Sequence, residues 1–145
     1  MLSAVIITFN EEKNIERCIL SLQAVADEVV VVDSLSTDKT RIISESLGAR
    51  VIEEAFRGHV EQKNYALSLA RHPYVLSLDA DEALSDDLIS SILKEKKAGF
   101  PHEGYSMNRL NRYCGKWIRH GLYYPDRKLR LVKKEFATWK GTDPH

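Results

Sequence analysis

The feature that most constrains the fold is a series of short apolar runs, rich in β-branched residues, that alternate with segments of helical periodicity. The runs are Leu2–Thr8, Glu28–Asp33, Arg50–Glu53 and Tyr74–Leu78. A run that is apolar at consecutive positions is typical of a strand covered on both faces, as in the centre of a parallel sheet. Strands that alternate with helices require crossover connections. The sequence therefore predicts an α/β fold with a mostly parallel sheet flanked by helices.

The segments between these runs carry the signals of helix ends. Asn10 is the predicted N-cap of the first helix, in which Ile15, Cys18, Ile19 and Leu22 form an apolar stripe. A polar turn at 34–38 precedes a helix that stops near Gly48, a third helix is expected at 61–70, and Ser85 is expected to cap a fourth that ends near Gly99.

The pattern changes after Gly99, where the strand–helix rhythm ends and aromatic residues become more frequent. Strands are expected at 105–110 and 128–132, on either side of an irregular loop. A length of 145 residues suits one domain, here with an N-terminal half at 1–99 and a different C-terminal segment at 100–145.

Charge and composition exclude several classes of protein. The 21 basic and 21 acidic side chains cancel, so no overall field attracts nucleic acid. Between Arg109 and Lys140, however, ten basic residues face only Asp126 and Glu135, which suits an anionic acceptor, a membrane surface or a partner protein. With no secretion signal at Met1 and no apolar stretch of membrane-spanning length, we expect a soluble, cytoplasmic protein in which Cys18 is a packed thiol.

Two carboxylates, Asp79 and Asp81, stand at the end of the fourth apolar run. Carboxylate oxygens suit Mg²⁺ or Mn²⁺, which commonly bridge protein carboxylates to the phosphates of a substrate. The alternative is a solvated acidic turn that caps the next helix. Polar residues also follow the first run, at Thr8 to Glu11, and the second, at Asp33. Because ligands of parallel sheets bind at the carboxyl ends of the strands, three such clusters favour a diphosphate-handling site.

Several ordered motifs resemble the family 2 glycosyltransferases, which have the GT-A fold. They are Ile6–Glu12, Val30–Thr40 and Leu78–Glu82, and two further segments, Gln62–Leu67 and Tyr124–Leu131, are similar to the bacterial lipopolysaccharide-core glucosyltransferases. The resemblance covers nearly the whole chain. It implies a nucleotide-binding half at 1–99 and a partial acceptor lobe at 100–145.

The resemblance implies roles for individual residues. Nucleotide contacts are implied for Thr8, Phe9, Asn10, Glu11, Asp33, Lys63 and Asp79. Asp33 would accept a hydrogen bond from the uracil imide, whereas Lys63 is either a diphosphate contact or an exposed helix lysine. Asp81 would bind a divalent metal directly, with Asp79 on the ribose or on the metal, and Glu82 is expected to cap the following helix.

The acceptor side is expected in the C-terminal segment. Trp117 and Arg127 are candidate acceptor contacts, whereas Lys128 and Arg130 are interpreted as solvated charges on a half-buried strand. Asp126 and Asp143 are the candidate general bases. The motif that ends at His145 resembles an interrupted one, so we expect the chain to be a fragment whose usual base lies further on.

The resemblance implies an inverting, metal-dependent transfer from a UDP-sugar, expected to be UDP-glucose, to a bacterial surface glycan such as lipopolysaccharide core. Such an enzyme would act at the inner face of the inner membrane. One alternative is a non-catalytic module that binds a nucleotide sugar. A nucleotidyltransferase is less favoured, because the segment Thr8–Glu12 lacks glycine and basic residues.

Overall fold

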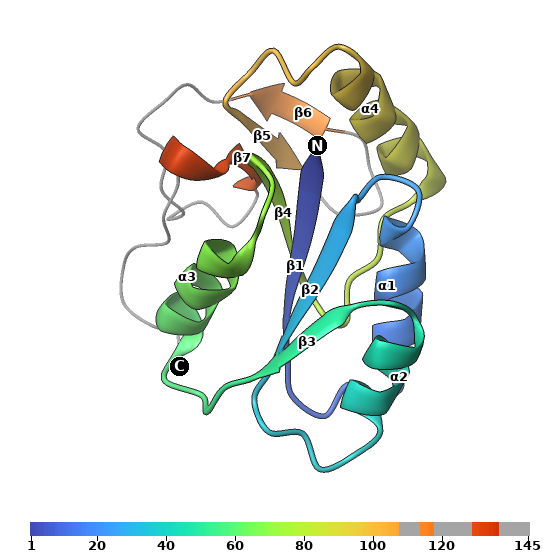
Figure 1. Cartoon of the computed structure of the whole chain (residues 1–145). Helices are drawn as coiled ribbons and strands as arrows, with labels where there is room; N and C mark the ends of the chain where they lie inside the picture. Colours follow the sequence, from blue (N-terminus) through green and yellow to red (C-terminus); the bar gives the residue numbers. More distant parts are fainter. Residues whose placement is uncertain (108–113, 118–128, 137–145) are drawn as a thin grey trace.

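A computed structural model describes residues 1–107, 114–117 and 129–136 (Figure 1). Its elements are β1 (Leu2–Thr8), α1 (Ile15–Leu22), β2 (Glu28–Asp33), α2 (Thr40–Ser46), β3 (Arg50–Glu53), α3 (His59–Leu69), β4 (Tyr74–Asp79), α4 (Asp86–Lys97), β5 (Gly104–Met107), β6 (Cys114–Trp117), β7 (Leu129–Lys133) and a short 3₁₀ helix (Lys134–Phe136). The strands form one sheet in the order β3-β2-β1-β4-β7-β5-β6. The predicted α/β class is confirmed.

The sheet has a parallel half and an antiparallel half. β1 pairs in parallel with β2 and with β4, and β2 pairs in parallel with β3. β7 pairs antiparallel with both β4 and β5, and β6 pairs antiparallel with β5. The change of pattern predicted after Gly99 therefore corresponds to a change from parallel to antiparallel pairing.

Helices cover both faces of the parallel half (Figure 1). The larger core lies on one face, where residues of β1 such as Leu2 and Ile6 pack with α1 and α4, and α2 packs at its margin. The smaller core lies on the other face, where Val5 of β1 packs with Ala66 and Leu67 of α3. Because the connections to β2 and β4 cross opposite faces, a topological switch point lies between β1 and β4, the usual position of a ligand crevice in open α/β sheets.

Two local predictions are wrong. Asn10 does not cap α1, which begins at Ile15 with Asn14 in the N-cap position. Instead, Asn10 has a left-handed backbone (φ 50°), a conformation that asparagine tolerates better than most residues. Cys114–Trp117 is also a strand, β6, and not part of an irregular loop.

Of the helices in the described part of the chain, none combines the length and the apolar composition of a membrane-crossing segment.

Candidate functional site

The carboxyl ends of three neighbouring strands bring the polar residues of the sequence motifs to one edge of the sheet. In the register of the sheet, Thr8 of β1 lies opposite Asp33 of β2, and Ile7 of β1 lies opposite Asp79 of β4. Asp33 and Asp79 thus stand on either side of the end of β1. This is the placement that the strand–helix pattern predicted.

The loop after β1 is joined to the loop after β2 by hydrogen bonds. The Asn10 amide donates to Ser36 Oγ at 2.8 Å, and the Thr37 amide donates back to Asn10 Oδ1 at 2.8 Å. The Glu11 amide donates to Thr40 Oγ1 at 2.9 Å. These reciprocal bonds hold the two loops as one unit beside the strand ends. Phe9, which lies between β1 and Asn10, is 56% exposed, so its side chain is accessible to solvent.

Asp33 is fully buried at the end of β2 and is held by its own turn. The Ser36 amide donates to Asp33 Oδ2 at 2.9 Å, and Ser36 Oγ donates to Oδ1. Beside it, Thr8 Oγ1 is buried and has no hydrogen-bond partner among the described residues. A buried hydroxyl without a partner is costly, which marks this strand end as a place where a ligand can supply a missing bond.

Asp38 confirms the expected turn chemistry of the second loop. It accepts hydrogen bonds from the Thr40 amide at 2.9 Å and from the Glu12 amide at 3.2 Å. Burial slightly opposes ionisation, but the hydrogen bonds from Thr40 and the backbone outweigh it and lower the pKa of Asp38.

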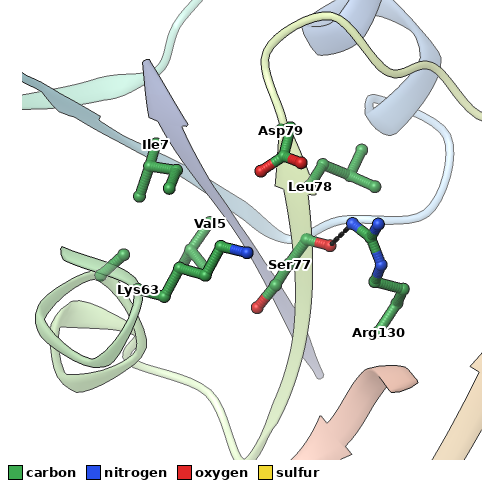
Figure 2. A pocket seen from close by; sticks show the side chains of 8 residues that line it. Val5, Ile7, Lys63, Ser77, Leu78, Asp79 and Arg130 are labelled. Atoms are coloured by element: carbon green, nitrogen blue, oxygen red, sulfur yellow. Dashed lines mark hydrogen bonds between the residues drawn. The ribbon is translucent and has the colours of Figure 1, made fainter. Parts of the chain in front are cut away.

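A pocket of about 250 Å³, including the solvent at its mouth, lies between α3, β1 and β4 (Figure 2). Its lining residues are Val5, Ile7, Lys63, Ala66, Ser77, Leu78, Asp79 and Arg130. Figure 2 shows the amino group of Lys63 and the carboxylate of Asp79 directed into the same space. The structure thus brings together two of the predicted site residues at the switch point.

Ser77 and Arg130 belong to this pocket but were not among the predicted site residues. Ser77 lies two positions before Asp79, so both side chains occupy the same face of β4. Ser77 Oγ is buried without a partner in the part of the chain that the structure describes. The signal that could have identified it is a hydroxyl within an otherwise apolar strand, in phase with the carboxylate.

At the end of β4 and in the turn that follows it, Asp79 is partly exposed and Asp81 is exposed, whereas Ala80 is buried. Within the described residues, no hydrogen bond or ion pair engages either carboxylate. The backbone of the turn, by contrast, is held by α1. Arg17 donates to the Asp81 carbonyl at 3.0 Å, and Cys18 Sγ donates to the Asp79 carbonyl at 3.7 Å.

Cys18 is a packed thiol, as the sequence predicted. Burial, together with the negative charges of Glu82 and Asp79, raises its pKa to about 12. Burial is the larger cause of this shift, and the carboxylates near α1 add to it.

The expectations for Glu82 and Arg130 are wrong. Ser85, not Glu82, caps α4, because its hydroxyl accepts from the Leu88 amide at 3.1 Å. Glu82 instead forms an ion pair with Arg130, whose side chain is only 16% exposed and therefore not solvated.

Several predicted residues remain untested. Asp126, Arg127, Lys128 and Asp143 lie outside the described residues, and for Trp117 the structure gives only the backbone of β6. Among the described residues, no group of three or more histidine, cysteine, aspartate or glutamate side chains is arranged to hold a metal ion.

Carboxylates at the switch point of the parallel half are typical of α/β proteins that bind a ligand at the carboxyl ends of their strands. The family model for glycosyl transferase family 2 matches residues 3–139. The chain belongs to this family, and the resemblance found in the sequence is confirmed.

Named relatives and solved structures agree with this assignment. An uncharacterized glycosyltransferase of Rickettsia bellii is 52% identical over 97% of this chain and 49% of its own length. The lipopolysaccharide core biosynthesis glycosyltransferase LpsC of Rhizobium meliloti is 40% identical over 92% of this chain and 51% of its own length. The chain thus spans about half the length of these relatives.

A crystal structure of glucosyl-3-phosphoglycerate synthase from Mycobacterium tuberculosis, in complex with Mn²⁺, UDP and glucosyl-3-phosphoglycerate, has the same fold. Its TM-score is 0.65 at 18% identity, over 93% of this chain and 57% of that one. The likeness confirms the GT-A architecture of the sheet and its helices.

Proposed function

We propose that the chain carries the donor-binding part of an inverting glycosyltransferase, which moves glucose from UDP-glucose to a bacterial surface glycan such as lipopolysaccharide core. The observation that carries this proposal is the register that sets Asp33 and Asp79 on either side of the end of β1. The name of the relative LpsC supports the class of acceptor. The UDP in the synthase complex supports the class of donor.

The two carboxylates have different proposed tasks. Asp33 would accept from the imide N–H of uracil, a donor that the cytosine ring lacks. Asp79 would face the diphosphate end of the donor, beside Lys63 in the pocket. The lining of the pocket includes Lys63 and Asp79 but neither Asp33 nor Thr8. We therefore assign it to one portion of the donor and assign the base to the strand ends near Thr8.

A divalent cation fits the residues of this turn. Asp79 and Asp81 supply hard oxygen ligands that no protein group engages within the described residues, and Mg²⁺ or Mn²⁺ sites commonly combine one or two carboxylates with water and substrate phosphates. Such an ion would offset the charge on the departing diphosphate. Lys63 would contribute a further positive charge on the α3 side of the pocket.

The remaining roles rest on the C-terminal segment. Asp126 or Asp143 is the proposed general base, which would remove the proton from the acceptor hydroxyl. Trp117 and Arg127 are the proposed acceptor contacts, by ring stacking and by charge.

Calorimetric titration with UDP in the presence of Mn²⁺ and of EDTA tests the donor site. We expect binding that requires Mn²⁺ and that weakens at least tenfold in both Asp79→Asn and Asp81→Asn, because each variant loses an anionic oxygen ligand. Asp87→Asn is the matched control, since it removes the same charge from an exposed position in the first turn of α4.

UDP affinity that is unchanged by EDTA and by both variants would contradict the proposed metal-dependent site. Transfer assays with UDP-glucose, UDP-galactose and UDP-N-acetylglucosamine then test the donor sugar. Binding without turnover of any donor would favour the alternative of a non-catalytic nucleotide-sugar-binding module.

A further inference from the structure

The ion pair between Glu82 and Arg130 connects the acidic turn to the antiparallel half of the sheet. Arg130 donates from Nη1 to Glu82 Oε1 at 2.8 Å and from Nη2 to Oε2 at 3.1 Å. The two side chains are 16% and 24% exposed, so the pair is largely shielded from water. Bidentate geometry of this kind fixes orientation as well as charge.

The pair also satisfies backbone groups of β4 beyond the point where its neighbour β7 stops pairing with it. β7 pairs with β4 only as far as Leu76. Further along β4, Arg130 Nη1 donates to the Ser77 carbonyl at 3.4 Å, a bond that Figure 2 shows at the pocket. Glu82 Oε1 accepts from the Asp79 amide at 2.8 Å. The side chains of Arg130 and Glu82 therefore hydrogen-bond to the backbone of β4 in place of a neighbouring strand, next to the carboxylate of Asp79.

The negative charge of the turn explains why Glu82 is paired with a cation. Asp79, Asp81 and Glu82 place three carboxylates within four residues. A partly buried carboxylate without a cation is costly, and a third free carboxylate would compete for any cation bound at the turn. Arg130 holds Glu82 toward β7 and leaves Asp79 and Asp81 available.

From this geometry we infer that Arg130 is a positioning residue, which acts through Glu82 to fix the strand-end carboxylates for metal and diphosphate binding. The inference rests on the proposed function of the same site. It assigns to β7 a part in donor binding, although β7 belongs to the C-terminal segment, which the sequence analysis assigned to the acceptor.

The first test compares Arg130→Met with Lys96→Met. Lys96 forms an ion pair with Asp27 at 2.8 Å, with side chains 25% and 27% exposed, at the amino-terminal edge of the parallel strands, where Asp27 also accepts from the Leu2 amide. Both variants replace a cation by an apolar side chain, and each removes an ion pair of similar exposure. We expect Arg130→Met to weaken Mn²⁺ affinity in the presence of UDP by about 10- to 100-fold. We expect Lys96→Met to leave that affinity unchanged, whatever its effect on stability.

The second test is the exchanged pair, Glu82→Arg with Arg130→Glu. It restores opposite charges, so a merely stabilising ion pair would be recovered. Arginine cannot accept a hydrogen bond, so the Asp79 amide stays without its partner. We therefore expect thermal stability to recover relative to either single variant while Mn²⁺ affinity does not.

A third measurement needs neither metal nor nucleotide. Glu82→Gln keeps a side-chain oxygen for the Asp79 amide, whereas Glu82→Leu removes it. Hydrogen exchange at the Asp79 amide should therefore accelerate about tenfold or more in Glu82→Leu and much less in Glu82→Gln.

The outcomes separate this inference from the function on which it rests. If the unaltered protein binds UDP without any need for Mn²⁺, the proposed function fails and the inference fails with it. If the unaltered protein requires Mn²⁺ but Arg130→Met and the exchanged pair bind it as tightly, the inference alone is wrong. Faster exchange at Asp79 with weaker Mn²⁺ binding supports it.

Discussion

Asp33 shows how one residue can hold a turn and still serve a ligand. A carboxylate has about four lone-pair positions, and Ser36 occupies two of those on Asp33. The bonds from Ser36 fix the carboxylate at the strand end, beside the Thr8 hydroxyl, which has no hydrogen-bond partner in the described part of the chain. Asp33 is fully buried. We therefore expect binding of a uracil ring to move the turn at 34–36 rather than to displace the carboxylate.

Replacing Asp33 by asparagine tests its proposed role in base recognition. Asp33→Asn should weaken UDP binding by about 10- to 100-fold, because hydrogen bonds to charged groups contribute roughly 1.5–3 kcal/mol. It should also reduce the preference for UDP over CDP, since an amide offers both a donor and an acceptor. Calorimetric titration with the two nucleotides measures both effects.

Ser36→Ala is the control for this prediction. It removes the hydroxyl bond to Asp33 but leaves the carboxylate and the backbone bond in place. A loss of stability with an unchanged UDP-to-CDP ratio is the expected result. An unchanged ratio in Asp33→Asn as well would contradict the role of Asp33.

At the scale of elements, short-range signals predicted most of the parallel half. β1, β2 and β3 have the predicted bounds, because apolar β-branched runs and their flanking turns are local properties of the sequence. Ser85 caps α4 as predicted, since a cap depends on residues three positions away.

The failures all depend on residues distant in the sequence. A polar residue after a strand suits an N-cap or a left-handed turn equally well. For Asn10 the left-handed turn is favoured by the hydrogen bond from the amide of Thr37, which is 27 residues away. The role of Glu82 is also determined by a distant residue, because its partner Arg130 is 48 residues further on. β6 carries no apolar pattern of its own and is defined by its pairing with β5. Local pattern therefore predicted where the carboxylates lie, but not what holds them.

The cap of α4 provides a quantitative test at this scale. Ser85→Ala should destabilise the protein by about 1 kcal/mol, because the Leu88 amide loses its acceptor at the helix start. Ser90→Ala, on an exposed position of the same helix, should be neutral or slightly stabilising because alanine is the better helix former. Urea unfolding measures both. Equal effects of the two substitutions would show that the cap contributes nothing.

In the molecule as a whole, the two ends of the parallel sheet use their carboxylates differently. At the amino-terminal edge, Asp27 accepts from the Leu2 amide and from Lys96, each at 2.8 Å. Its neighbour Glu28 accepts from Ser3 Oγ and from the Arg71 amide. At the carboxyl-terminal edge, Asp79 and Asp81 have no such partners within the described residues. The carboxylates at the amino-terminal edge contribute to stability, whereas the carboxyl-terminal edge keeps those of Asp79 and Asp81 available for a ligand.

This asymmetry predicts opposite effects of the same substitution at the two edges. Asp27→Asn should lower the free energy of unfolding by about 1 kcal/mol at pH 7, since it weakens bonds to Lys96 and to a backbone amide. It should leave Mn²⁺-dependent UDP binding intact. Asp81→Asn should weaken that binding at least tenfold with no loss of stability, because it removes a charge that has no partner within the described residues from a turn that is crowded with carboxylates.

The pKa of Asp27 determines how its contribution to stability changes with pH. Burial opposes ionisation of Asp27, but the hydrogen bonds from Lys96 and Leu2 outweigh it, so the folded state holds its pKa below the ordinary value of 3.8. The stabilisation is therefore complete above that pH and is lost as the pH falls through the folded-state pKa. Urea unfolding midpoints of the unaltered protein and Asp27→Asn should differ at pH 7 and converge toward pH 2. A difference that persists in acid would mean that Asp27 stabilises the fold by packing and not by its charge.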